Sequence, residues 1–346
     1  MNVKAYGTTA ASKELAPMTI ERRRVGDDDV SIQIHYCGIC HSDIHQARNE
    51  WKNTLYPCVP GHEMAGVVLE VGKNVKKFKV GDTVGVGCLV DSCGECSSCR
   101  EDLENYCENG MTFSYNSEDR FSGGHTFGGY ATHVVVKEHF VLKMPTNLDL
   151  AAAAPLLCAG ITTYSPLKHV GLRAGHKIGV LGLGGLGHMG VKLAVAMGAE
   201  VTVLSRSSAK KADAQRMGAQ HYLDMSVESE KQKMANHFDF VLDTVSAKHD
   251  INEVCNLIKR DGTFIMVGAS DVPLDLAVFS LILKRRKMMG SLIGGLKETQ
   301  DMLDFCAKHN IVCDIEKIDP SQINATYEKI LAGKVKYRAV IDCSKF

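Results

Sequence analysis

The spacing of apolar residues changes near residue 150 and divides the chain into two parts. Before that point, short alternating apolar runs are separated by glycines, as in AGVVLEVGKNVKKFKVGDTVGVG at residues 65–87. Successive side chains of a strand point to opposite faces, so this pattern predicts short strands joined by turns. A β-barrel or sandwich is therefore expected for the first part of the chain.

After residue 150, buried apolar runs alternate with helical patterns. The segment HKIGVLGLG (176–184) predicts a strand, residues 185–199 a helix and EVTVLSR (200–206) a second strand. A helix at 208–219 and further strands at 220–224, 239–245 and 262–269 extend the alternation. Such alternation is typical of a parallel sheet covered on both faces. From about 296 the chain returns to mixed helix and strand, ending in YRAVIDC.

Length and charge narrow the class of protein. A chain of 346 residues favours two domains, and its formal net charge of zero argues against nucleic acid or an anionic membrane as the main partner. We find no apolar run near the roughly 20 residues that span a bilayer, and no signal peptide at the N-terminus. A cytoplasmic location is therefore expected. In reducing cytosol, the 13 cysteines are better explained by metal binding or catalysis than by disulfides.

The densest cysteine cluster lies in DSCGECSSCREDLENYC. Its spacing is C-x2-C-x2-C-x7-C, formed by Cys93, Cys96, Cys99 and Cys107. Four thiolates on one loop can occupy all four coordination positions of a tetrahedral zinc ion and leave none open, as in structural sites. An iron–sulfur cluster uses similar spacings, so the cysteines alone leave the metal open.

A metalloenzyme would need a second, open site. The candidates are Cys40 in GICHSD, His62 in PGHE and Cys158 in LLCAG. Two cysteines and one histidine leave a fourth zinc position for water or substrate. Each residue alone is a weak signal, and Cys158 by itself is more typical of a small core residue.

The coenzyme motif is VLGLGGLGHMG. Gly182, Gly184 and Gly187 form G-x-G-x-x-G, with Gly185 added, directly after a predicted strand and at the start of a helix. Glycines there allow a tight turn and close approach of a pyrophosphate, whose charge the helix N-terminus favours. This context predicts a dinucleotide site.

These motifs together identify a family resemblance. GHEMAGVVLEVG, the four-cysteine loop, LLCAGITTYSPL and GLGGLGHMG follow one another at family-like separations. The chain resembles the zinc-dependent medium-chain alcohol dehydrogenases, and among them the cinnamyl-alcohol-dehydrogenase-like aldehyde reductases. The resemblance implies an α/β protein with three segments: a GroES-like β-barrel catalytic domain (1–150), a doubly wound Rossmann domain that binds NADP (151–295), and a C-terminal return to the catalytic domain (296–346).

The resemblance also implies roles around two zinc ions per chain. Cys40, His62 and Cys158 would bind the catalytic zinc, and the four-cysteine loop would bind the structural one. Glu63 would lie beside the catalytic ion and can exchange onto it, although an ordinary carboxylate at a strand edge is the alternative. Asp43 would orient His62 through its second ring nitrogen. Cys37 has no matching role and is expected to be a small buried residue.

Ser42 and His45 are the candidates for proton transfer. A hydroxyl followed three residues later by an imidazole can form a relay, because histidine titrates near neutrality. The alternative for His45 is a surface histidine on a short helix.

The remaining coenzyme and substrate residues are also assigned by resemblance. His41 and Arg338 would face the pyrophosphate, and Thr162 would pack against the nicotinamide. Trp51 and Leu55 would wall the pocket, which suits aromatic or medium-chain primary aldehydes and alcohols; a plain core aromatic is the alternative for Trp51. Relatives pair their Rossmann domains through segments matching GTFIMVGA and LILKRRKMMGSLIG, so a homodimer is expected.

The second strand of the coenzyme domain ends in a pattern that favours NADP. An acidic residue about 20 residues past the glycine turn binds the adenine ribose and repels a 2′-phosphate. Here Ser205 stands in that place, followed by Arg206 and, one turn later, Lys210. Serine can donate to phosphate, and arginine and lysine add positive charge.

Three functions compete at this point. The first is an NADP-dependent alcohol dehydrogenase that works mainly as an aldehyde reductase on a small molecule. The second is a zinc–thiolate redox or metal-sensing protein on the same fold. The third is a silent protein that only binds coenzyme. The joint presence of metal, relay and glycine-turn residues favours the enzyme.

Overall fold

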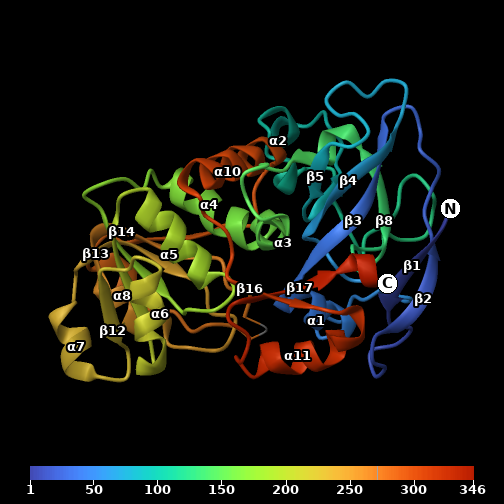
Figure 1. The fold of residues 1–346 in the computed structure, drawn as a ribbon. Coiled ribbons are helices and arrows are strands. Elements are labelled where there is room, and N and C mark those ends of the chain that lie inside the picture. Colours follow the sequence, from blue (N-terminus) through green and yellow to red (C-terminus); the bar gives the residue numbers. More distant parts are fainter. Residues whose placement is uncertain (271) are drawn as a thin grey trace. The chain divides into compact units, whose positions relative to one another are not determined.

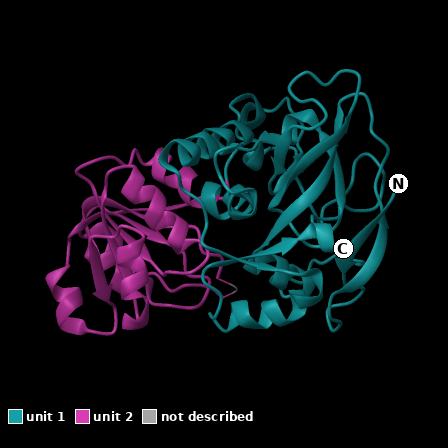
Figure 2. Cartoon of the chain, in the orientation of Figure 1, with its two compact units in different colours: residues 1–161, 294–346 teal, residues 162–293 magenta. Residues whose placement is uncertain are grey.

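The structure is a computed structural model that describes residues 1–270 and 272–346. The chain forms two compact units: residues 1–161 with 294–346, and residues 162–293 (Figure 2). Among the described residues, no single helix is long and apolar enough to cross a membrane. Residues Leu150–Leu157 and Ala159–His169 reach that length and composition only when counted together, across a bend of 54°.

The first unit is built mainly of antiparallel strands. Its seven-stranded sheet has the order β16-β17-β3-β4-β5-β9, with β8 also paired to β3, and β1-β2 and β6-β7 form two small sheets (Figure 1). Its strands are β1 (Asn2–Gly7), β2 (Ala16–Glu21), β3 (Asp29–Ile39), β4 (Met64–Val71), β5 (Thr83–Val86), β6 (Leu89–Asp91), β7 (Thr112–Phe113), β8 (His133–Lys137), β9 (Leu142–Lys143), β16 (Ile315–Ile318) and β17 (Arg338–Asp342).

Short helices connect these strands. The α-helices are α1 (His41–Ala47), α2 (Ser97–Arg100), α3 (Leu150–Ala153), α10 (Leu296–His309) and α11 (Ile323–Leu331). The 3-10 helices are η1 (Glu104–Tyr106), η2 (Glu138–Phe140), η3 (Ala154–Leu157), η5 (Pro320–Gln322) and η6 (Cys343–Lys345). Helix α4 (Ala159–His169) contains the boundary between the two units in sequence.

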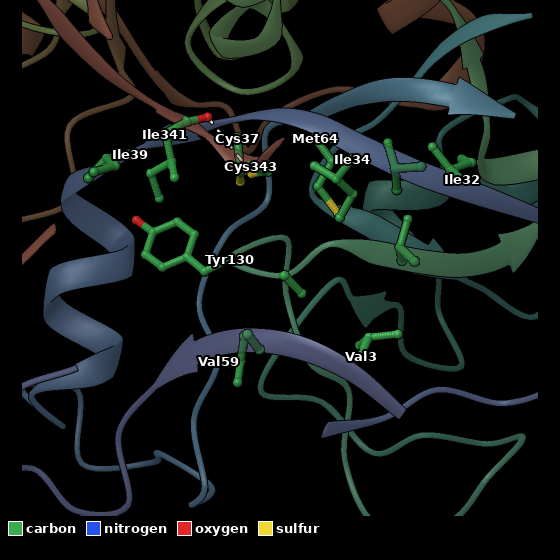
Figure 3. Close-up of a cluster of buried hydrophobic side chains, with 14 of the residues drawn as sticks. Val3, Ile32, Ile34, Cys37, Ile39, Val59, Met64, Tyr130, Ile341 and Cys343 are labelled. Atoms are coloured by element: carbon green, nitrogen blue, oxygen red, sulfur yellow. Dashed lines mark hydrogen bonds between the residues drawn. The ribbon is translucent and has the colours of Figure 1, made fainter. Parts of the chain in front are cut away.

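The core of the first unit joins residues from both ends of the chain. Figure 3 shows Ile39 of β3, Ile341 of β17 and Tyr130 on one side of the cluster, with Cys37 of β3 next to them. Strand β17 pairs antiparallel with β3, with Ile341 opposite Cys37. Cys37 is fully buried in this core, and burial raises the pKa of its thiol. It is the small buried residue that the sequence predicts.

The second unit is a parallel six-stranded sheet. Its strand order is β12-β11-β10-β13-β14-β15, and every pairing in it is parallel (Figure 1). The strands are β10 (Lys177–Leu181), β11 (Glu200–Ser205), β12 (His221–Asp224), β13 (Phe238–Asp243), β14 (Ile258–Met266) and β15 (Lys287–Gly290). The helices are α5 (Gly187–Ala196), η4 (Ser208–Lys210), α6 (Lys211–Arg216), α7 (Glu228–Lys233), α8 (Ile251–Leu257) and α9 (Phe279–Ile282).

This sheet confirms the predicted fold class. Its middle strands are apolar runs, because both faces of a parallel sheet are covered by helices. Helix α5 packs against β10 and β11, and α8 packs against β14. The order corresponds to the doubly wound dinucleotide-binding arrangement, in which the chain turns back at the centre of the sheet, here between β10 and β13.

Candidate active site and coenzyme site

Four metal-binding side chains converge inside the first unit. The donor atoms of Cys40, His62, Glu63 and Cys158 all lie within 4.8 Å of one another, and all four residues are buried. Cys40 caps the N-terminus of α1, His62 and Glu63 directly precede β4, and Cys158 follows η3. Residues 118 positions apart in sequence therefore meet at one point.

Asp43 fixes the two ligand-bearing segments. Its Oδ1 lies 3.0 Å from Nδ1 of His62 and accepts the backbone N–H of Gly61 at 3.0 Å. Its Oδ2 accepts the backbone N–H of Cys40 at 2.8 Å, so Asp43 also closes the first turn of α1. The imidazole must donate its Nδ1 proton to the carboxylate, which leaves Nε2 as the metal donor.

The chemistry of this donor set suits zinc with an open position. Hydrogen bonding from Cys158 lowers the pKa of the Cys40 thiol well below its ordinary value, so the cluster already favours a thiolate. Two thiols and one imidazole are a known catalytic zinc set that leaves a fourth position free. The residues present therefore fit the metal.

Glu63 is the fourth member of the cluster, and Arg338 holds its side chain in place. Its side chain is fully buried, Oε1 forms an ion pair with Arg338 of β17, and Oε2 has no hydrogen-bond partner. Burial raises the pKa of Glu63 to about 7, while Arg338 opposes that rise. Arg338 is only 4% exposed, so its guanidinium is committed to Glu63 in this unit. The ion pair itself was not foreseen, because its partners lie 275 residues apart.

Helix α1 also presents the proposed proton-transfer residues. Ser42 Oγ lies 3.8 Å from Cys40 Sγ, and His45 is one turn further along α1. Nδ1 of His45 pairs with Glu50, a residue that the sequence reasoning missed. An acid five positions after a candidate relay histidine was the available signal. The pairing holds the imidazole ring in one orientation.

The predicted pocket and pyrophosphate residues beside α1 are exposed. His41 is the exposed first residue of α1. Trp51 and Leu55 are 39% and 43% exposed, and the Trp51 ring centroid lies 5.5 Å from that of His45. Trp51 is thus not a core aromatic. Its ring faces the relay histidine.

The four-cysteine loop forms a second, separate cluster. The donor atoms of Cys93, Cys96, Cys99 and Cys107 lie within 4.8 Å of one another, and Cys93 Sγ is 3.9 Å from Cys99 Sγ. Zinc–sulfur bonds of about 2.3 Å in a tetrahedron place sulfurs about 3.8 Å apart, so the spacing fits. Backbone N–H groups of Glu95 and Cys96 point at Cys93 and lower its pKa to about 6.

The glycine turn lies at the carboxyl end of β10 in the second unit. Gly182 has φ of +87°, which favours glycine, and a Cβ at Gly187 would lie 2.1 Å from the carbonyl oxygen of Gly182. A Cβ at Gly184 would meet no atom within 4 Å, so that side of the turn is open. Gly185 lies between them in the turn. The close packing at Gly187 and the open space at Gly184 together fit the close approach of a pyrophosphate.

The residues expected at the 2′-phosphate lie next to this turn in the same unit. Ser205 ends β11, Arg206 is exposed directly after it, and the Lys210 ammonium donates to the carbonyl of Leu183 at 2.8 Å. Lys210 thus connects η4 to the glycine turn. Thr162 is 7% exposed at the start of the unit.

Comparison with known proteins shows the family of the chain. Residues 26–146 match the alcohol dehydrogenase GroES-like domain, and residues 185–308 match the zinc-binding dehydrogenase domain. The chain belongs to the zinc-binding alcohol dehydrogenase family. It is 53% identical to the aldehyde reductase YahK of Escherichia coli over 99% of this chain and 98% of that protein.

Solved structures of this alcohol dehydrogenase family have the same fold. A cinnamyl alcohol dehydrogenase from Sorghum bicolor aligns with a TM-score of 0.97 at 42% identity, covering 99% of this chain and 98% of that one. The enzyme named CAD from Helicobacter pylori, complexed with NADP(H), aligns with a TM-score of 0.94 at 45% identity, covering 100% and 99%. The predicted family and fold are confirmed.

Proposed function

We propose that this protein is a zinc- and NADP-dependent alcohol dehydrogenase that acts mainly as an aldehyde reductase. It interconverts primary alcohols and aldehydes, either aromatic or medium-chain. The convergence of the donor atoms of Cys40, His62, Glu63 and Cys158 within 4.8 Å of one another carries this proposal. The first unit serves as the catalytic domain and the second as the coenzyme domain. The names of the two relatives, an aldehyde reductase and a cinnamyl alcohol dehydrogenase, support the substrate class.

The chain's own residues set up the reaction. When bound, zinc polarises a substrate oxygen as a Lewis acid and the nicotinamide accepts or supplies hydride. Cys40, His62 and Cys158 would hold the metal, and Asp43 keeps His62 in the tautomer that presents Nε2. Glu63, paired with Arg338, keeps a carboxylate beside the open position.

Proton transfer is assigned to α1. Ser42 passes the proton of the substrate oxygen toward His45, and Glu50 orients the imidazole from its far side. His45 is 21% exposed, which gives the proton an exit to water.

Coenzyme binding is assigned to the second unit. Gly182, Gly184 and Gly187 admit the pyrophosphate at the N-terminus of α5. Ser205, Arg206 and Lys210 bind the 2′-phosphate. Thr162 is assigned to the nicotinamide, and Trp51 and Leu55 of the first unit are assigned to the substrate.

Pairing of two chains is proposed through the second unit. Among the described residues, strand β15 pairs only with β14. Phe279 and Ile282 of α9 and the following Leu283 are 62–72% exposed. Exposed apolar residues beside an unpaired strand edge favour a homodimer. Sedimentation at micromolar concentration that shows only monomer would contradict this part of the proposal.

One experiment tests the central proposal. Oxidation of NADPH is followed with an aromatic primary aldehyde, before and after removal of zinc by a chelator. We expect turnover that is lost with the metal and restored by zinc. Coenzyme binding without turnover would indicate a silent binding protein, and metal binding without coenzyme binding would indicate a sensor.

A further inference from the structure

A buried ion pair stands at the end of β13 in the coenzyme unit. Asp243 is the last residue of β13, and its side chain is 2% exposed. His249 follows six residues later, with its side chain 7% exposed. Nε2 of His249 lies 3.0 Å from Oδ2 of Asp243, and Nδ1 lies 2.9 Å from the carbonyl oxygen of Ala247.

The hydrogen bonds of His249 define its charge. A carboxylate and a backbone carbonyl are both acceptors only, so each ring nitrogen must carry a proton to satisfy them. His249 is therefore an imidazolium. The hydrogen bond to Asp243 raises the pKa of His249 above its ordinary value, against the opposing effect of burial. The imidazolium neutralises the charge of a buried carboxylate whose other oxygen, Oδ1, accepts the backbone N–H of Val245 at 3.0 Å.

The pair lies where the sheet binds its ligand. In a doubly wound sheet the crevice opens at the carboxyl ends of the strands where the chain reverses, here between β10 and β13. Asp243 ends one of these strands. The next residue, Thr244, donates its hydroxyl to the carbonyl of Leu181 at 2.8 Å, directly before the glycine turn.

Charged side chains of two different elements act on His249. Asp243 favours its protonated form, and Arg206, which follows β11, disfavours it by like charge. Arg206 is also the residue proposed for the 2′-phosphate. Arg206 is thus near enough to the His249–Asp243 pair to act on it by charge, and an unneutralised acid there would repel a 2′-phosphate bound by Arg206.

We propose that His249 is a coenzyme-specificity residue that acts through Asp243. Its proton cancels the one acidic charge at the end of β13, so that a coenzyme with an additional phosphate can bind beside Arg206. This inference rests on the proposed use of NADPH. Two features then allow the 2′-phosphate to bind: position 205 holds a serine where an acid would repel the phosphate, and the acid at Asp243 is neutralised by His249.

Direct coenzyme binding tests the inference without turnover. NADPH and NADH are titrated separately by the change in nicotinamide fluorescence. His249→Gln keeps an amide donor for Asp243 and removes the positive charge. We expect the Kd for NADPH to rise about tenfold, equal to about 1.4 kcal/mol, and the Kd for NADH to change much less. Equal weakening of both coenzymes would show a merely structural role and overturn the proposal.

A double variant separates charge from shape. His249→Gln with Asp243→Asn removes both charges, and we expect it to recover the NADPH affinity of the wild type. Asp243→Asn alone should bind NADPH at least as tightly as the wild type, which keeps the test open even if His249→Gln fails to fold. Failure of Asp243→Asn to rescue a folded His249→Gln would contradict neutralisation.

The pH dependence follows from the same charge. As pH rises through the raised pKa of His249, the imidazolium loses its proton. The negative charge of Asp243 is then no longer neutralised, and the affinity for NADPH falls. The 2′-phosphate also titrates, with a pKa of about 6, so the informative quantity is the difference between wild type and His249→Gln. We expect that difference to be largest at low pH and to vanish at high pH. A difference independent of pH would overturn the proposal.

A matched control exists in the same sheet. His221 and Glu200 form a similar pair, with 3.1 Å between Nε2 and Oε1, at the opposite, amino-terminal edge of β12 and β11. His221→Gln should leave both Kd values unchanged. If the wild type binds no NADPH at all, the proposed function fails. If it binds NADPH and His249→Gln has no selective effect, only this inference fails.

Discussion

Asp43 divides its two carboxylate oxygens between the segments that carry Cys40 and His62. Oδ1 lies 3.0 Å from the His62 ring, and Oδ2 accepts the Cys40 backbone N–H at 2.8 Å. Because Asp43 is fully buried, water does not compete for these bonds. One carboxylate thus sets the separation of two metal ligands that are 22 residues apart in the chain.

Asp43→Asn should loosen this arrangement. The amide nitrogen that replaces one carboxylate oxygen cannot accept a hydrogen bond, so the contact with either His62 or Cys40 is lost. Changes of this type typically cost 10- to 100-fold in metal affinity or activity. Zinc per chain after dialysis against a chelator, together with kcat/KM, measures the effect. Asp29→Asn is the control, since Asp29 is also buried but pairs with Arg23 at the start of β3, the end of the strand opposite to Cys40. Zinc retention equal to the wild type would refute the role of Asp43.

The two cysteine clusters should respond differently to loss of a thiol. Cys158→Ala should abolish turnover while the protein stays folded and keeps one zinc. Cys99→Ala should lower the midpoint of thermal unfolding or disturb assembly, because a closed site stabilises the lobe that carries it. Elemental analysis and thermal unfolding distinguish the two. Cys255→Ala, a buried thiol outside both clusters, should keep both metals. Iron in the wild-type protein would contradict the assignment.

Coenzyme choice should move with the residues that follow β11. Hydrogen bonds to charged groups contribute about 1.5–3 kcal/mol each, so Arg206→Ala should weaken NADPH about ten- to a hundredfold and spare NADH. Ser205→Asp should shift preference toward NADH by repelling the 2′-phosphate. Arg260→Ala, an exposed arginine on β14, is the control. Equal use of both coenzymes by the wild type at limiting concentration would defeat this prediction.

His45→Gln should slow turnover and change its pH profile. General acid–base help typically contributes 10²- to 10⁴-fold, and water can replace part of it. The measurement is kcat across pH, with coenzyme affinity measured separately. His169→Gln, an exposed histidine at the end of α4, should leave the profile unaltered. The same rate and profile in His45→Gln would remove His45 from the mechanism.

Gly38→Ala should destabilise the first unit. A Cβ at Gly38 would lie 1.8 Å from Oε2 of Glu63, which is fully buried and ion-paired with Arg338, so the carboxylate has no room to move. Overpacking of this kind typically costs about 1–3 kcal/mol in the free energy of unfolding. Denaturant unfolding measures it. Gly184→Ala is the control for stability, because a Cβ there would meet no atom within 4 Å.

The sequence predicted the second unit well because its signals are local. Strands β10, β11 and β13 are apolar runs buried on both faces, and the glycine turn marks the junction between β10 and α5. Each of these features is contained in about ten residues. The parallel sheet follows from their alternation alone.

Most of the side-chain contacts that position the candidate site residues could not be predicted from the sequence. Arg338 meets Glu63 because β17 pairs with β3, and no local pattern carries a pairing across 275 residues. The His249–Asp243 pair was missed for another reason: its histidine lies in a loop, where no periodicity assigns a direction to a side chain. Glu50 could have been found, since it lies five residues from His45.

The place of β17 between β16 and β3 has a consequence for how the chain folds during synthesis. All of the second unit, residues 162–293, is made after β3 and before β17. Its sheet uses only contiguous sequence and can form first. The seven-stranded sheet of the first unit can be completed only when β16 and β17 are made, so until then the position beside β3 is unfilled and Glu63 lacks its cation. The first unit is therefore the last part of the protein to be completed, although its first strands are the first to be synthesised.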